Sequence, residues 1–197
     1  MRIAISGTHC IGKSTLIDEF LRVYPEFVHE PEPYTVLVED YGEEFSQEPR
    51  VEDFHRQLEF NVERLKLHKS EARVIYERCP IDFVAYIAVL DPKYTETVLD
   101  HVLDGLKHVD LIVYLPLNDD GDNIDAEAEP NRRQVAALQG GDPFPKLRKA
   151  VDRRLSAIYR EDAFGITSSC DVVVEEATGS TDQRLRTIKT ILRRNLT

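Results

Sequence analysis

The first fifteen residues, MRIAISGTHCIGKST, constrain the fold of this chain more than any other stretch. A short apolar strand at residues 3–5 runs into a loop at residues 7–14 that matches the pattern G-x-x-x-x-G-K-[ST]. Apolar residues then recur at helical spacing: Leu16, Ile17, Phe20 and Leu21. This order of strand, glycine-bracketed loop and helix predicts a loop that binds phosphate with backbone N–H groups at a helix N-terminus.

The residue types in the loop suit a polyphosphate. Gly7 and Gly12 allow backbone angles and a close approach that a Cβ would block. Lys13 can reach the β- and γ-phosphates, and the Ser14 hydroxyl can ligate Mg²⁺. We therefore expect a Mg-ATP site, with Mg-GTP left open. Its predicted residues are Gly7, Thr8, His9, Cys10, Ile11, Gly12, Lys13, Ser14 and Thr15.

The length and composition predict one cytoplasmic domain. At 197 residues, with 42% hydrophobic and 31% charged residues, the chain can bury a core as a single domain, 1–197, that carries a lid. No stretch approaches the roughly 20 apolar residues of a membrane span, and the N-terminus enters the first strand without a signal-peptide pattern. The three cysteines lack ligand spacing, so we expect free thiols.

The charge of the chain argues against two classes of partner. A net charge of −11 repels nucleic acid and anionic membrane surfaces at long range, so neither is an expected partner. The acidic residues gather in 26–53 and the basic ones in 146–160, where a small anion could meet a local positive site. Two solvated faces of opposite sign are the alternative. A homodimer is left open.

Strands alternate with helices along the chain. Apolar runs predict five strands, at 3–5, 27–29, 73–76, 109–116 and 171–174. Helical periodicity predicts helices from Ser14 and at 53–69, 81–90, 95–107 and 146–162, with a last helix capped by the run 180–183. Pro31 and Pro33 are expected to exclude an immediate helix after the second strand. The pattern predicts an α/β protein with a parallel sheet.

Charged side chains follow two of the predicted strands. Ligands of such sheets lie beyond the carboxyl ends of the strands, so Glu30 could face the transferred phosphate, although a surface glutamate in a turn is the alternative. After the third strand, Glu77 can hold Mg²⁺ through water, and Arg78 can neutralise phosphate charge that grows during transfer.

Two further groups are candidates for ligand contacts. Gln57, Asn61 and Arg64 share one face of the helix at 53–69, and such a face can recognise a planar ligand such as a base; an ordinary amphipathic helix is the alternative. Arg132 and Arg133 lie in a Gly-, Asp- and Pro-rich segment at about 118–148, where a lid could cover the polyphosphate; solvent-exposed arginines on a flexible loop are the alternative.

Together these motifs resemble the P-loop kinases of the nucleoside and nucleotide branch. The order GTHCIGKST, Glu30-Pro31, Phe54 with Gln57 and Arg64, and Glu77-Arg78 is similar to that of deoxynucleoside kinases. The phrase ERCPIDFVAY resembles a stretch of the AAA-type ATP-binding proteins that include bacterial nicotinamide riboside kinases. Thymidylate kinases share a related strand-end arginine pair.

The resemblance implies a three-layer P-loop fold with a five-stranded parallel sheet, and a role for each matching residue. Glu30 would be the base that deprotonates the acceptor hydroxyl, and Arg78 would bind phosphate. Ser14 and Glu77 would hold Mg²⁺. The base of the acceptor would be contacted by Gln57, Arg64 and Asp82, and the lid arginines would be Arg132 and Arg133. The chain departs from the deoxynucleoside kinases in having Cys79 after Glu-Arg, a long acidic lid and no tryptophan.

The sequence therefore predicts a Mg-ATP-dependent kinase that phosphorylates a hydroxyl of a small, nucleoside-like acceptor. A nucleoside monophosphate kinase is the near alternative, with Arg50, Arg56, Arg64 and Arg78 as candidates for the acceptor phosphate. A nucleotide-dependent switch or regulatory ATPase is a second alternative, although the chain has no N-K-x-D or T-K-x-D guanine signature. A 5′-hydroxyl kinase of RNA or DNA fits the net charge poorly.

Overall fold

The computed structural model describes residues 1–70, 72–117 and 144–195. In these residues five parallel strands form one sheet: β1 (Arg2–Ser6), β2 (Val28–Glu30), β3 (Val74–Glu77), β4 (Leu111–Tyr114) and β5 (Val173–Glu176). Their order is β2-β3-β1-β4-β5. The chain leaves β1 toward β2 and β3 on one side and reaches β4 and β5 on the other. The carboxyl end of β1 is thus the switch point at which α/β sheets bind ligands.

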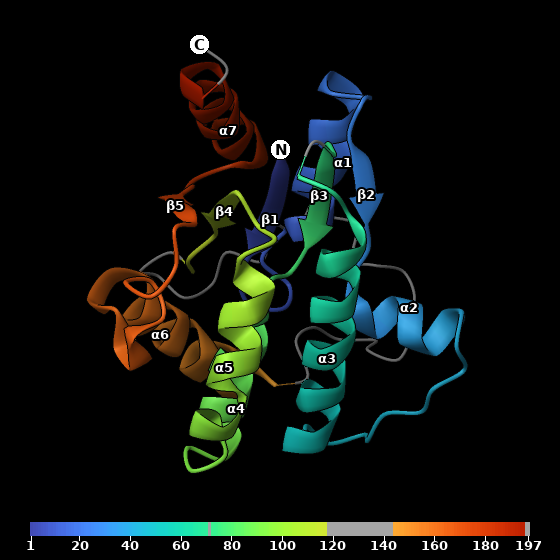
Figure 1. Cartoon of the computed structure of the whole chain (residues 1–197), viewed down its shortest axis with the longest axis vertical. Helices are drawn as coiled ribbons and strands as arrows, with labels where there is room; N and C mark the ends of the chain where they lie inside the picture. Colours follow the sequence, from blue (N-terminus) through green and yellow to red (C-terminus); the bar gives the residue numbers. More distant parts are fainter. Residues whose placement is uncertain (71, 118–143, 196–197) are drawn as a thin grey trace.

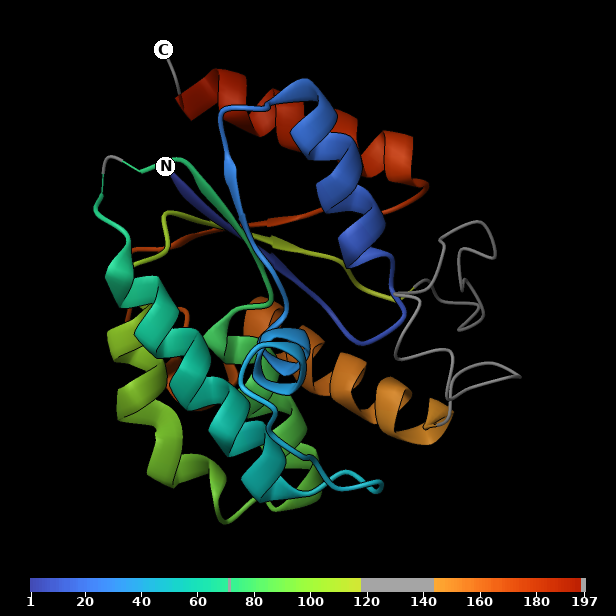
Figure 2. The same ribbon diagram turned by 90° about the vertical axis from the view of Figure 1, so that its right-hand side faces the viewer.

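Helices cover both faces of the sheet, which gives three layers (Figures 1 and 2). One face carries α1 (Lys13–Val23) and α7 (Thr181–Asn195). The other carries α3 (Val51–Leu67), α4 (Pro80–Leu90), α5 (Thr95–Leu106) and α6 (Pro145–Glu161). A short 3-10 helix, η1 (Ala163–Gly165), follows α6. None of the described helices is long and apolar enough to cross a membrane.

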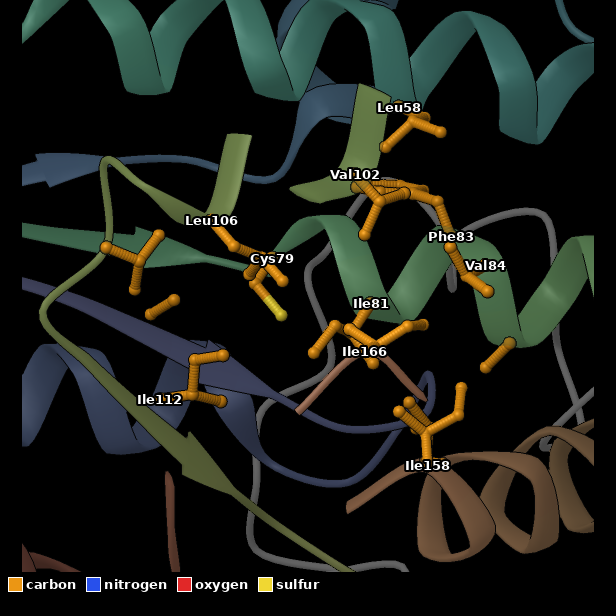
Figure 3. Packing of buried hydrophobic residues seen from close by; sticks show 14 of the residues in the cluster. Leu58, Cys79, Ile81, Phe83, Val84, Val102, Leu106, Ile112, Ile158 and Ile166 are labelled. Atoms are coloured by element: carbon orange, nitrogen blue, oxygen red, sulfur yellow. The ribbon is translucent and has the colours of Figure 1, made fainter. Parts of the chain in front are cut away.

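The two faces have separate cores because neighbouring strand residues point to opposite sides. In β1, Ala4 packs with α3, α4 and α6, whereas Ile3 and Ile5 pack with α1 and α7. Figure 3 shows the first of these cores, where Ile112 of β4, Cys79 and Ile158 of α6 approach the residues of α4. Each fully buried aliphatic side chain contributes about 1.5–3 kcal/mol to the stability of the fold. The packing on both faces therefore fixes the position of β1, whose carboxyl end carries the phosphate loop.

The predicted α/β class and parallel five-stranded sheet are confirmed. The prediction that prolines exclude a helix after the second strand was wrong, because α2 (Pro33–Glu39) begins at Pro33. A proline at the first helical position loses no hydrogen bond, and its fixed φ suits the helix. The predicted lid at 118–148 lies largely outside the described residues, together with Arg132 and Arg133.

Candidate functional site

The loop between β1 and α1 is shaped by backbone positions that demand glycine. A Cβ on Gly7 would lie only 2.8 Å from the carbonyl oxygen of Leu115, so a side chain there would displace the chain just after β4. Gly12 precedes α1 with a φ of 86°, in the left-handed region. Cys10 also has a positive φ, 57°, and its side chain is exposed. The loop thus forms a tight cradle at the N-terminus of α1, as expected for a phosphate site.

Lys13 lies inside this cradle. Its Nζ donates a hydrogen bond to the carbonyl oxygen of Thr8, 2.8 Å away. Burial and the nearby Arg78 guanidinium lower the pKa of Lys13. An ammonium group held in the loop with little water around it gains from an anion, so this arrangement suits a polyphosphate.

Ser14 and Glu77 meet at the end of β3. The Ser14 hydroxyl donates a 2.8 Å hydrogen bond to Oε1 of Glu77. Burial and the neighbouring Glu32 carboxylate raise the pKa of Glu77. A hydroxyl and a carboxylate that repels a second carboxylate are oxygen ligands of the kind that Mg²⁺ prefers, and a cation would relieve the repulsion. The two residues therefore fit the predicted magnesium role.

Glu32 and Arg78 form a buried ion pair beside the loop. Nε of Arg78 donates to Oε1 of Glu32, and Nη1 reaches the carbonyl oxygen of Gly7 at 3.3 Å. Glu32 is 7% exposed and Arg78 5% exposed. Burial alone would raise the pKa of Glu32, but Arg78 and Lys13 lower it below its usual value. Arg78 also has a φ of 78°, a strained backbone angle of the kind that collects at functional sites.

Glu30, the carboxylate that the sequence pointed to, lies in a different cluster. It forms an ion pair with Arg64, and its Oε1 lies 2.7 Å from Nε2 of His68. Arg64 also donates to the carbonyl oxygen of Pro31, at 2.8 Å. Glu32 is the residue that sequence reasoning missed. The signal was present, because both glutamates precede a proline in Glu30-Pro31-Glu32-Pro33.

A cavity of about 220 Å³ opens next to the ion pair and the loop. Its walls come from the phosphate loop, from the chain around α2 and α3, and from α4 and the start of α6. The described residues that line it are His9, Cys10, Glu32, Tyr34, Phe45, Ser46, Gln47, Pro49, Asp53, Phe54, Gln57, Arg78, Tyr86, Phe144 and Leu147. Aromatic walls with a few polar groups are typical of small-molecule sites.

Of the three residues predicted to contact the base of the acceptor, Gln57 lies in the cavity wall, whereas Arg64 and Asp82 are not among the described lining residues. The side-chain amide of Gln57 donates to the backbone carbonyl of Asp53 at 3.1 Å. This bond uses the amide nitrogen and fixes the orientation of the group. Nearby, Phe54 stacks on Tyr86 with ring centroids 4.4 Å apart and planes at 12°.

Asp82 lies behind the phosphate loop and is fully buried. Its Oδ1 accepts a 2.8 Å hydrogen bond from the N–H of Gly7, and its Oδ2 accepts one of the same length from the N–H of Cys79. The carboxylate therefore ties the start of the loop to the N-terminus of α4. Tyr86 makes a second tie, since its hydroxyl lies 3.1 Å from the backbone nitrogen of His9 and 2.7 Å from His9 Nδ1.

The remaining predicted residues of the phosphate site are in place around the cradle. Thr8 and Ile11 are buried within the loop, and Thr15 is half-buried in the first turn of α1. The structure therefore brings together the loop, Ser14 with Glu77, and Arg78, and it adds Glu32, Tyr86 and Phe54. Glu30 and Arg64 form the separate cluster, and Asp82 supports the loop from behind.

Solved structures share this architecture. Deoxyadenosine kinase from M. mycoides with the products dCMP and a flexible dCDP matches with a TM-score of 0.65 at 15% identity, over 98% of this chain and 100% of that chain. The same kinase with bound dATP matches with a TM-score of 0.63 at 15% identity and the same coverage. NadR protein in complex with NR matches with a TM-score of 0.60 at 12% identity, over 98% of this chain and 48% of that chain.

This chain spans about half of the NadR chain that it matches in structure. Its family is identified by comparison of sequences. No curated protein matches the sequence significantly. A family model described as an AAA domain matches residues 2–168, which include the phosphate loop, the Glu32–Arg78 pair and all of α6. The chain belongs to this AAA domain family and has the fold of P-loop nucleoside kinases.

Proposed function

We propose that this protein is a kinase that uses Mg-ATP to phosphorylate a hydroxyl group of a small, nucleoside-like acceptor. The observation that carries the proposal is the buried Glu32–Arg78 pair, which lies between the phosphate loop and the aromatic cavity. At this position the carboxylate can contact the acceptor, and the guanidinium can contact the phosphoryl group that is transferred. The likeness to a deoxyadenosine kinase and to NadR, whose structures contain dCMP and NR, supports this class of acceptor.

Each group has a defined task in this proposal. Glu32, whose lowered pKa keeps it ionised at neutral pH, accepts the proton of the acceptor hydroxyl. Arg78 and Lys13 offset the negative charge of the transferring phosphoryl group. Ser14 and Glu77 would hold Mg²⁺, which would supply positive charge to offset the charge of the phosphates. Arg132 and Arg133 keep their predicted role in covering the phosphates.

The aromatic part of the cavity is the proposed acceptor site. The stacked rings of Phe54 and Tyr86 offer an apolar wall for a planar base. Gln57, whose amide nitrogen is engaged by the backbone of Asp53, presents its oxygen as an acceptor for a base N–H group. Glu32, at the same cavity, would then face the sugar hydroxyl.

The arginines favour a hydroxyl acceptor over a nucleoside monophosphate. Arg56 binds Glu43 through three contacts of 2.6–3.1 Å, and Arg64 is paired with Glu30. Arg78 is held by Glu32. Of the four candidates for an acceptor phosphate, Arg56 and Arg64 are therefore paired with carboxylates outside the cavity lining, Arg50 is exposed, and Arg78 is assigned to the transferred phosphoryl group.

The proposal is tested by an ADP-release screen with Mg-ATP across nucleosides, nucleotides, NR and small metabolites. We expect one nucleoside-like compound to stimulate ADP release and to appear as a phosphorylated product by mass spectrometry. Lys13→Ala is the control and should abolish the signal. ADP release that no acceptor changes would favour the regulatory ATPase instead, and a product formed only from nucleoside monophosphates would favour the alternative kinase.

A further inference from the structure

Arg184 of α7 reaches the phosphate loop from the far end of the chain. Its Nη1 donates a 2.6 Å hydrogen bond to the backbone carbonyl oxygen of Ile11, and the two residues are 173 positions apart in sequence. Arg184 is only 3% exposed. Burial of a guanidinium group carries a large desolvation cost, so a specific contact is needed to keep it there. One such contact is with the loop itself.

Packing holds the two partners in place. The Ile11 side chain lies in the same apolar core as Leu185 and Ile188, which flank Arg184 on α7. This core lies between α7 and α1, on the face of the sheet that these two helices cover (Figure 2). The position of the guanidinium relative to the loop is thus fixed by a closely packed layer.

The bonded carbonyl belongs to the peptide that joins Ile11 to Gly12. In a planar trans peptide the C=O and N–H bonds point in opposite directions. A carbonyl held toward Arg184 therefore directs the N–H of Gly12 away from α7. Gly12, at φ 86°, is a residue for which both signs of φ are accessible, so this peptide needs an external contact to fix its orientation.

We propose that Arg184 is a positioning residue that sets the orientation of the Ile11–Gly12 peptide, so that the Gly12 N–H can bind a phosphate oxygen of the nucleotide. The last helix thereby determines the affinity of the loop for polyphosphate. This inference rests on the proposed function in one respect, namely that the loop binds the phosphates of Mg-ATP. It adds a determinant of that binding from outside the motif.

The experiment is isothermal titration of the full-length protein with Mg-ATP and, separately, with Mg²⁺ and inorganic tripolyphosphate. Arg184→Met removes the donor but keeps much of the side-chain volume, and Arg184→Lys keeps the charge without the fork of donors. Arg186→Met is the matched control, because Arg186 is exposed on the same helix. Thermal unfolding and circular dichroism confirm that each variant is folded.

We expect Arg184→Met to raise the Kd for both ligands by the same factor, about tenfold, which corresponds to one hydrogen bond to a charged group. Arg184→Lys should fall between Arg184→Met and the wild type, and Arg186→Met should stay within about twofold of the wild type. In a kinase assay the KM for ATP should rise, whereas the KM for the acceptor should not.

Unchanged binding of both ligands by Arg184→Met would overturn the inference. Weaker binding of Mg-ATP with unchanged binding of tripolyphosphate would also overturn it, because Arg184 would then act on the nucleoside end. If Arg184→Met does not fold, Arg184→Lys decides by the same two criteria. A wild-type protein that binds Mg-ATP but phosphorylates nothing would refute the proposed function and leave this inference standing; one that binds neither ligand would refute both.

Discussion

Two clusters of ion pairs are built on glutamates at the end of β2 and just after it, Glu30 and Glu32, and they differ in what surrounds them. The outer cluster consists of Glu30, Arg64 and His68, and the inner cluster consists of Glu32, Arg78 and Lys13. In the outer cluster the carboxylate side chain is 17% exposed and joins the end of β2 to the end of α3. In the inner cluster it is 8% exposed and lies at the phosphate loop and the cavity.

The comparison separates an ion pair outside the cavity from one that lines it. Both glutamates precede a proline, and both bind an arginine. Of the two, only Glu32 lines the cavity, and the charge of Lys13 further lowers its pKa. A carboxylate is suited to chemistry when it faces a ligand site as well as a counter-ion.

The largest effect expected is that of Glu32→Gln. Loss of the proposed general base should lower kcat by about 10³-fold, while the Kd for Mg-ATP stays within a few-fold. Steady-state kinetics and titration with Mg-ATP measure the two quantities. Glu30→Gln is the matched control and should keep kcat within about threefold of the wild type. The opposite ranking of the two variants would return the catalytic role to the outer cluster.

Glu77, which lies beside Glu32 of the inner cluster, allows a test through the Mg²⁺ requirement of the protein. Glu77→Gln keeps the hydrogen bond from Ser14 but removes the charge, so the Mg²⁺ concentration needed for half-maximal activity should rise by about 10–100-fold. Burial and Glu32 raise the pKa of Glu77, whereas Arg78 and Lys13 lower that of Glu32. Acidification of the wild type should therefore weaken Mg²⁺ binding first, which raises the Mg²⁺ concentration needed for activity, and base catalysis second. Activity measured against Mg²⁺ at a series of pH values tests this order.

Glu30→Gln should instead act on stability. Removal of its charge leaves the half-buried Arg64 without a carboxylate, and we expect a loss of about 1–2 kcal/mol in the free energy of unfolding. Burial already lowers the pKa of Arg64, which shows that its charge is costly there. Urea unfolding of Glu30→Gln beside the wild type measures the loss. Equal unfolding midpoints would mean that the charge of Glu30 contributes nothing to the free energy of unfolding.

The smallest effect is expected at His68. His68→Ala should cost about 0.5 kcal/mol at neutral pH, because the side chain is partly exposed to solvent. Burial and Arg64 lower the pKa of His68. A histidine with a lowered folded pKa contributes stability above its unfolded pKa and loses it as the pH falls through the folded value. The difference between His68→Ala and the wild type should thus shrink on acidification, which thermal unfolding at several pH values would show.

Much of the fold could be predicted because it depends on patterns within short stretches of sequence. The phosphate loop, the buried strands and the apolar stripes of α3 and α6 follow from glycine positions and from hydrophobic periodicity. The helix α2 could not be predicted in this way, since the two prolines around Glu32 suit either a turn or a first helical turn. Packing against α3 decided between them.

Less of the candidate site could be predicted from the sequence. Ser14 and Glu77 are predicted from motif and strand end, and the structure places them in contact. Asp82, in contrast, occupies a motif position that resembles a base contact but directs both oxygens to backbone N–H groups. Tyr86 follows in the same motif, and no sequence pattern indicates that its hydroxyl meets His9. Such contacts depend on how α4 docks under the loop.

By itself the sequence determined that a phosphate-loop motif joins a strand to a helix and which class of sheet presents it, because a glycine-bracketed loop between a strand and a helix encodes its own backbone geometry. Only the tertiary structure decided which of Glu30 and Glu32 faces the cavity, and it alone brought Arg184 to the loop. The reason is physical: backbone conformation is set by neighbouring residues, whereas the partner of a buried charge is set by the packing of segments that lie far apart in the chain.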